Sequence, residues 1–145
     1  MLPSSLTLTA TLSGAADEDV TVSISTSGTG TEGTDYATIS DITISAGNTT
    51  GTASFTPTDD TTYEGDETAI VAISGVSGGS ASESGTQTTT ITITDNESAP
   101  TVTLASSASS IAENAGSSLT LTATLSVATT ADVTVSLTPT GTGTE

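Results

Sequence analysis

Leu6-Thr7-Leu8-Thr9-Ala10-Thr11-Leu12 alternates apolar and polar residues without a break. Successive side chains of a β-strand point to opposite faces, so this stretch predicts a strand with one apolar face and one face of threonine hydroxyls. The stretch belongs to a run of ten letters, residues 4–13, that stands again without change at residues 117–126. The spacing from position 4 to position 117 predicts a tandem repeat with a period of 113 residues.

Two shorter runs repeat at the same spacing. Residues 19–23 match 132–136, and residues 28–32 match 141–145. We therefore expect two domains. Residues 1–99 would form one module that lacks its first strand, and residues 100–145 would hold the first strands of the next, truncated module.

Alternation with a period of two recurs along the chain, bounded by turns rich in glycine, serine and aspartate. The predicted strands lie at residues 20–24, 42–44, 53–55, 69–73, 89–93 and 102–104. Residues 75–85 are rich in serine and glycine and predict a long turn. No window shows the spacing of a helix. These features predict an all-β fold, an antiparallel immunoglobulin-like β-sandwich with seven strands in each repeat.

Composition excludes several classes of function. The chain has 17 acidic residues, no lysine, arginine, histidine or cysteine, and a formal charge of −17. Without cationic side chains it cannot neutralise phosphates, so we expect no nucleic-acid partner, and no apolar run is long enough for membrane insertion. Without histidine and cysteine it can form no Ser-His-Asp triad and no zinc–thiolate site. We expect no enzyme.

The hydrophobic core is expected to be thin. Only 32% of the residues are hydrophobic, and the aromatic residues are Tyr36, Phe55 and Tyr63. A core built mainly from small aliphatic side chains leaves little surplus stability, so a bound metal or a neighbouring module would help.

The most acidic stretch is Asp59-Asp60-Thr61-Thr62-Tyr63-Glu64-Gly65-Asp66-Glu67, with five carboxylates and one turn glycine in nine residues. Carboxylates confined to one loop repel each other unless they spread into water or share a cation. Oxygen ligands on a flexible turn suit Ca²⁺ best. We interpret the stretch as the centre of a calcium site, and a solvated acidic surface is the simpler alternative.

Four motifs resemble the Calx-β module, which occurs in sodium–calcium exchangers, integrin β4 and giant bacterial surface proteins. They are Gly33-Thr34-Asp35-Tyr36, the acidic stretch with Thr68, Ile91-Thr92-Ile93-Thr94-Asp95-Asn96-Glu97, and Ile111-Ala112-Glu113-Asn114. The resemblance implies a seven-stranded β-sandwich with calcium ions at one end.

The resemblance also implies a set of calcium ligands. In this sequence they are Asp35, Asp59, Asp60, Glu64, Glu67 and Asp95, with Glu113 as a ligand from the first strand of the following module. Asp66 and Glu97 are weaker candidates. Calcium ions and neighbouring repeats are the implied partners.

These features predict a calcium-stiffened structural repeat of an extracellular stalk, fibre or adhesin, carried by a large secreted or surface-attached bacterial protein. Asp95 precedes the linker 96–100, so an ion held there would stiffen the junction between modules. The absence of lysine and arginine also leaves no site for trypsin-like proteases, which suits an extracellular position.

Two alternatives stay open. In the first, the chain is a self-assembling filament subunit, and residues 100–113 of one copy complete the sandwich of another by strand exchange. In the second, the threonine rows form a carbohydrate-binding or ice-binding surface. Asn48 and Asn96 each begin an N-glycosylation sequence, so glycans are further candidate partners. Residues 28–33 fit G-x-G-x-x-G, but they open no helix and predict a turn.

Overall fold

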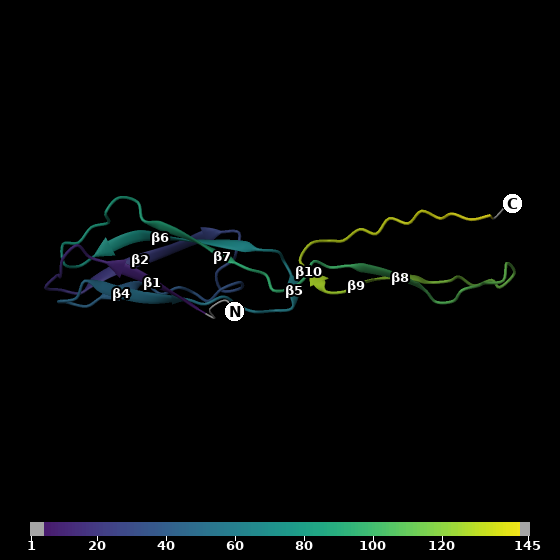
Figure 1. The fold of residues 1–145 in the computed structure, drawn as a ribbon, viewed down its shortest axis with the longest axis horizontal. Helices are drawn as coiled ribbons and strands as arrows, with labels where there is room; N and C mark the ends of the chain where they lie inside the picture. The colour runs from purple at the N-terminus through teal and green to yellow at the C-terminus, as the bar shows by residue number, and fades with distance from the viewer. Residues whose placement is uncertain (1–4, 143–145) are drawn as a thin grey trace. The chain divides into compact units, whose positions relative to one another are not determined.

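The computed structural model describes residues 5–142, which form β-strands and no helix (Figure 1). The strands are β1 (Leu6–Thr11), β2 (Val20–Gly28), β3 (Ile42–Ile44), β4 (Thr50–Phe55), β5 (Thr62–Tyr63), β6 (Glu67–Ser77), β7 (Thr88–Ile93), β8 (Val102–Ser106), β9 (Leu121–Leu125) and β10 (Ala128–Thr129). Across the described residues no helix is long and apolar enough to cross a membrane. The prediction of an all-β chain is confirmed.

The chain divides into two compact units. The first runs up to Asp60 and resumes at Asp66–Asp95, and the second combines Thr61–Gly65 with the residues from Asn96 onward. The first unit holds a four-stranded antiparallel sheet in the order β3-β2-β6-β7 and a two-stranded antiparallel sheet of β1 and β4. The two sheets enclose the core, as in a β-sandwich; the count of seven strands in each repeat stays a prediction.

The strand β6 is longer than the sequence indicates. Its pairing with β2 continues past Gly75 to Ser77, within the stretch predicted as a turn. The extension depends on a bulge, because the register shifts between Ser23 and Ile24. Asp41 closes this bulge, since its carboxylate accepts hydrogen bonds from the Ser23 hydroxyl at 3.1 Å and from the Ile24 backbone N–H at 3.0 Å.

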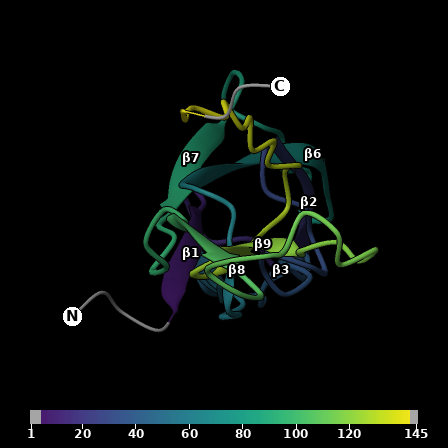
Figure 2. The ribbon, with the colours of Figure 1, turned by 90° about the vertical axis from the view of Figure 1, so that its right-hand side faces the viewer.

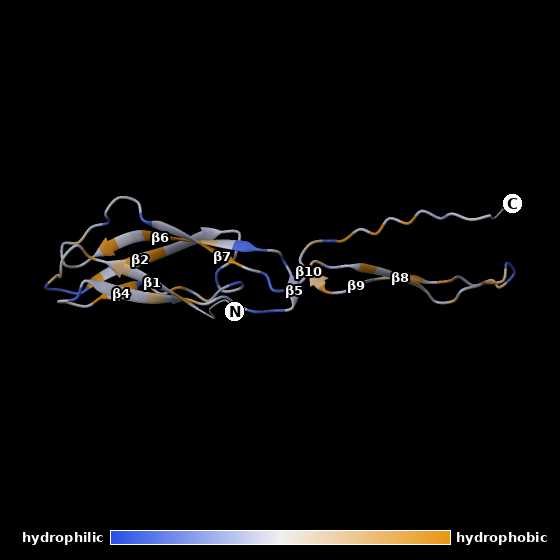
Figure 3. Ribbon diagram, in the orientation of Figure 1, coloured by the Kyte–Doolittle hydropathy of each residue, from blue (hydrophilic) through white to orange (hydrophobic). Residues whose placement is uncertain are grey.

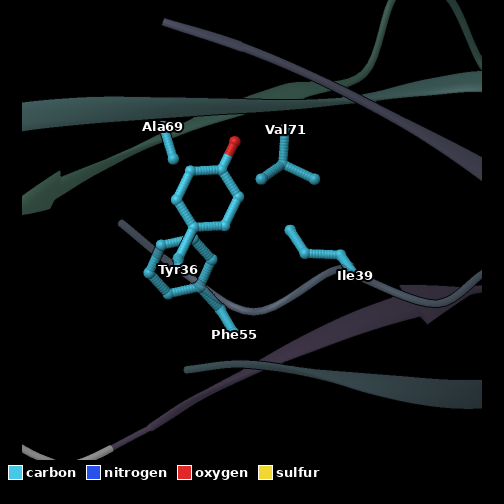
Figure 4. Packing of buried hydrophobic residues seen from close by; sticks show 5 residues of the cluster. All are labelled: Tyr36, Ile39, Phe55, Ala69 and Val71. Carbon is cyan, nitrogen blue, oxygen red and sulfur yellow. The ribbon is translucent and has the colours of Figure 1, made fainter. Parts of the chain in front are cut away.

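The core lies between the two sheets in two adjoining clusters. One contains Tyr36 and Phe55, whose stacked rings have centroids 4.9 Å apart (Figure 4). Figure 4 shows the ring of Tyr36 directed towards Ala69 and Val71 of β6. The members of the second cluster are Val20, Val22, Ile42 and Ile44. With Ile39, nine apolar side chains of the described residues are buried, which agrees with the prediction of a thin core with few aromatic residues.

The second unit has no comparable core. Its β8 and β9 form an antiparallel hairpin, and β10 pairs in parallel with β5. None of its described residues is buried. The hydropathy colouring of Figure 3 shows apolar residues on β8 and β9, and among them Val102, Leu104 and Leu121 are exposed.

Candidate metal centre

Four segments of the first unit meet at one end of the sandwich. The Gly30 N–H donates to the carbonyl oxygen of Thr68 at 3.0 Å, which ties the loop after β2 to the beginning of β6. The Thr58 N–H donates to the carbonyl oxygen of Asp35 at 2.9 Å, which ties the segment after β4 to the same loop. The pairing of Glu67 with Ile93 adds the end of β7. Acidic residues from four parts of the sequence therefore share this end.

Asp35 is held in a tight turn. Its carboxylate accepts a 2.6 Å hydrogen bond from the Thr31 N–H, and its own N–H donates to the Thr31 carbonyl oxygen at 2.9 Å. Gly33 makes the turn possible because it has a φ of +85°, a region that L residues with side chains rarely adopt. The carboxylate is half-buried and fixed in direction, and its two oxygens offer more acceptor positions than one hydrogen bond uses.

Glu67 brings a second carboxylate to Asp35. It is the first residue of β6 and is half-buried, and a carboxylate oxygen of each residue lies within 4.8 Å of the other. Gly30 lies beside this carboxylate, because a Cβ atom there would lie 3.4 Å from Glu67 Oε2. Two unit charges at this separation repel by roughly 1 kcal/mol in water and about 3.5 kcal/mol at an effective dielectric constant of 20. A cation between them would replace repulsion with attraction.

Asp66 and Asp95 lie next to this pair along the strands. The Asp95 N–H donates to Asp66 Oδ1 at 3.1 Å, just beyond the register that pairs Glu67 with Ile93. Asp66, a weaker candidate on sequence grounds, therefore holds the chain in place after β7. Asp95 is half-buried at the same end.

Asp59 and Asp60 follow the anchored residue Thr58. Both are exposed, and the hydrogen bond from Thr58 to Asp35 keeps their segment beside the Asp35 loop. Their backbone is thus held at the acidic end, while their side chains lie at the surface.

The remaining predicted ligands belong to the second unit. Glu64 is exposed and directly follows β5, and Glu113 is exposed in a turn closed by a 3.0 Å hydrogen bond from the Ala115 N–H to the Ala112 carbonyl oxygen. Their participation in one site with Asp35 stays a prediction.

Other acidic side chains stabilise the fold, which no sequence pattern indicated. Glu32 accepts hydrogen bonds from the Thr26 hydroxyl at 2.6 Å and from the Ile39 N–H at 3.0 Å. Asp19 accepts one from the Ala46 N–H at 2.8 Å. Asp41 closes the bulge described above. Because each accepts hydrogen bonds from protein donors, these carboxylates stabilise the fold of the sandwich.

The donor set suits a hard cation. The acidic end offers carboxylate oxygens, and the sequence holds no imidazole or thiolate with which to bind a softer metal. Such an oxygen-only set on turns of the chain fits Ca²⁺, which accepts six to eight oxygens in flexible geometry.

Comparison with known proteins gives one match. The sequence model of the Calx-beta domain family matches residues 5–97. No curated protein and no solved structure matches the chain.

Proposed function

The chain belongs to the Calx-beta domain family, and we propose that it is a calcium-binding structural module of an extracellular stalk, fibre or adhesin. Calx-beta domains are non-catalytic structural β-sandwiches, are known for calcium binding, and are typically extracellular or surface-exposed. The family supports the coarse part of the proposal, and the acidic end supports the finer part.

The observation that carries the proposal is the approach of Asp35 to Glu67. Their carboxylate oxygens lie within 4.8 Å in a chain that has no lysine, arginine or histidine. Folding thus concentrates negative charge that no side chain of this protein can neutralise. Bound calcium would supply the missing positive charge.

The residues of the first unit have distinct parts in this proposal. Asp35 and Glu67 form the fixed centre, because one is held by its turn and the other by β6. Asp59 and Asp60 would close over it from the neighbouring segment, and Asp95 would join from the end of β7. Glu64 and Glu113 complete the predicted ligand set.

A stiffening role follows from where these segments lie in the sequence. Asp95 stands immediately before the linker that leads to β8, and the acidic stretch separates β4 from β6. If both are drawn to one ion, the chain that leaves the sandwich loses freedom. Weak binding, with dissociation constants of about 10⁻⁴ to 10⁻³ M, is typical of extracellular modules and matches extracellular calcium concentrations.

Calorimetric calcium titration of the 145-residue chain, with Asp35→Asn beside it, tests this proposal. We expect binding in the millimolar range for the unchanged protein and at least a ten-fold weaker response for the variant. The matched control is Asp17→Asn, which removes one charge from an exposed residue before β2, at the other end of this strand. If Asp35→Asn binds calcium as well as Asp17→Asn does, the proposed centre is wrong.

A further inference from the structure

The strand β1 lies in a two-stranded sheet. Among the described residues its single partner in the sheet is β4. The other edge borders a groove of about 1080 Å³, whose far wall is formed by residues of β6 and β7. Figure 2, an end-on view, shows β1 and β7 on the same side of the sandwich. An edge strand presents backbone N–H and C=O groups on which a further strand can pair.

The groove exposes part of the core. Leu8, Ala10 and Leu12 line it and are only half-buried, although they lie on the apolar face of β1. Ile73 of β6, also half-buried, lines it as well. A strand added at the edge of β1 would cover this face with its own apolar side chains.

The hairpin of β8 and β9 indicates how a further strand could pair with β1. Leu121–Leu125, the strand β9, repeats the letters of residues 8–12, and it pairs antiparallel with β8. The register places Val102 opposite Leu125 and Leu104 opposite Ala123. The structure thus pairs β8 with a strand that has the letters of residues 8–12, and it sets the register of that pairing.

We propose that β8 of a second copy of this chain adds to the edge of β1 that borders the groove. Carried over by the repeat, the register sets Val102 opposite Leu12 and Leu104 opposite Ala10. Directly opposed residues of antiparallel strands share one face of the sheet, so both donor side chains enter the groove. This pairing does not depend on bound calcium.

The exchange favours the pairing with β1. In the hairpin with β9, Val102 is 43% exposed and Leu104 is 55% exposed, because no second sheet covers them. When β8 leaves β9 and pairs with β1, it exchanges one set of backbone hydrogen bonds for an equal set, because the two partner strands have the same sequence. The burial of two apolar side chains against an existing core favours the new pairing, and the cost of association sets the protein concentration that it needs.

A donor from another copy fits better than one from the same chain. To pair antiparallel with β1, β8 must begin beside Leu12, at the end of the sandwich opposite to Asp95. The hydrogen bond from Asp95 to Asp66 leaves the segment 96–101 to span the length of β1, about 20 Å. That span would use nearly the full reach of the segment, about 24 Å. A second copy is free of this restraint.

Paired cysteines test the register directly, because the chain has none of its own. The double variant Thr103→Cys with Thr11→Cys sets two thiols opposite each other only across the proposed interface. We expect disulfide-linked dimers and longer chains on non-reducing gels. The matched control is Thr103→Cys with Thr7→Cys, which displaces one thiol by four residues along the same face. It should remain largely unlinked.

A second variant keeps β8 paired with β9 of its own chain. Thr103→Cys with Thr124→Cys joins β8 to β9, where these residues are opposed. By sedimentation in calcium-free buffer, the unchanged chain should at least double its average mass as its concentration rises. The oxidised variant should stay monomeric and regain association after reduction. A calcium site that fails its own test leaves this result unaffected.

Two outcomes would overturn the proposal. The unchanged chain could remain monomeric at every concentration, or the Thr11 and Thr103 thiols could join within one chain. If the chain stays monomeric, a peptide of residues 100–107 is added to the oxidised Thr103→Cys/Thr124→Cys chain. Binding of this peptide would mean that the edge accepts such a strand from a preceding repeat and not from a second copy.

Discussion

Residues 19–23 and 132–136 have the same five letters, Asp-Val-Thr-Val-Ser, and different structures. In the first unit they begin β2, where Val20 is fully buried and Val22 is 4% exposed. In the second unit they form no strand, and Val133 and Val135 are 45% and 40% exposed. Alternation therefore specifies which face would be apolar, and it does not by itself produce a strand.

The difference lies in the neighbours. The strand β2 lies between β3 and β6, which supply its backbone hydrogen bonds and one wall of the core. The 145 residues contain a single copy of the β3 and β6 sequences, so the second copy of β2 has neither partner. A β-strand becomes stable through cross-strand pairs and burial more than through its own propensity.

The largest effect is expected when a charge is placed at the two matched valines. Val20→Asp would bury a carboxylate in the core and should cost about 4 kcal/mol or more of unfolding free energy. Val133→Asp should change it by less than about 0.5 kcal/mol, because that residue is already in water. Urea unfolding followed by circular dichroism measures both. Equal losses would show that residues 132–136 fold into a sandwich in solution.

Truncation of a large side chain should give the next largest difference. Phe55 is 1% exposed against Tyr36, so Phe55→Ala should cost about 3 to 5 kcal/mol. Leu137→Ala removes a side chain that is 54% exposed and should be nearly neutral. Thermal unfolding of both variants measures the two losses of stability. An unchanged stability of Phe55→Ala would contradict the described core.

Calcium should separate the two regions by a smaller amount. With a dissociation constant of about 0.1 to 1 mM, roughly 10 mM calcium should stabilise the first unit by about 1.4 to 2.7 kcal/mol. Hydrogen exchange should slow at the amides of β2 and β6 and stay unchanged at residues 132–137. Chelation should reverse the effect. Uniform slowing in both regions would indicate general screening of charge and no specific site.

The smallest expected effect concerns the matched aspartates. Asp19 accepts a hydrogen bond from the Ala46 N–H, so Asp19→Ala should cost about 1 kcal/mol. Asp132 is its counterpart in the repeat, where no copy of Ala46 exists in these residues, and Asp132→Ala should have no measurable effect. Chemical unfolding with both variants in parallel tests this difference, and equal values would remove Asp19 from the interactions that stabilise the sandwich.

Much of the fold could be predicted because the alternation is regular. The apolar residues of 20–24, 42–44 and 89–93 lie in strands as expected, and the chain is all-β. The end of β6 could not be predicted, because Gly75 and Ser77 read as turn residues. Their place in a strand depends on pairing with β2 across a bulge, which is a long-range interaction.

The candidate site could likewise be predicted only in part. The sequence indicates an acidic, oxygen-only site, because carboxylates are the only strong ligands that the chain has. It does not separate ligands from structural acceptors. Asp35 and Asp41 both stand in loops, yet one lies within 4.8 Å of Glu67 and the other closes a bulge.

The sequence by itself determined the β class, the apolar face of each strand, the repeated letters and the excess of negative charge, because these follow from local pattern and composition. Tertiary structure decided which copy of a repeated segment becomes a strand and which carboxylates approach each other. Those outcomes depend on contacts between residues far apart in the chain, and identical letters with different partners have different structures.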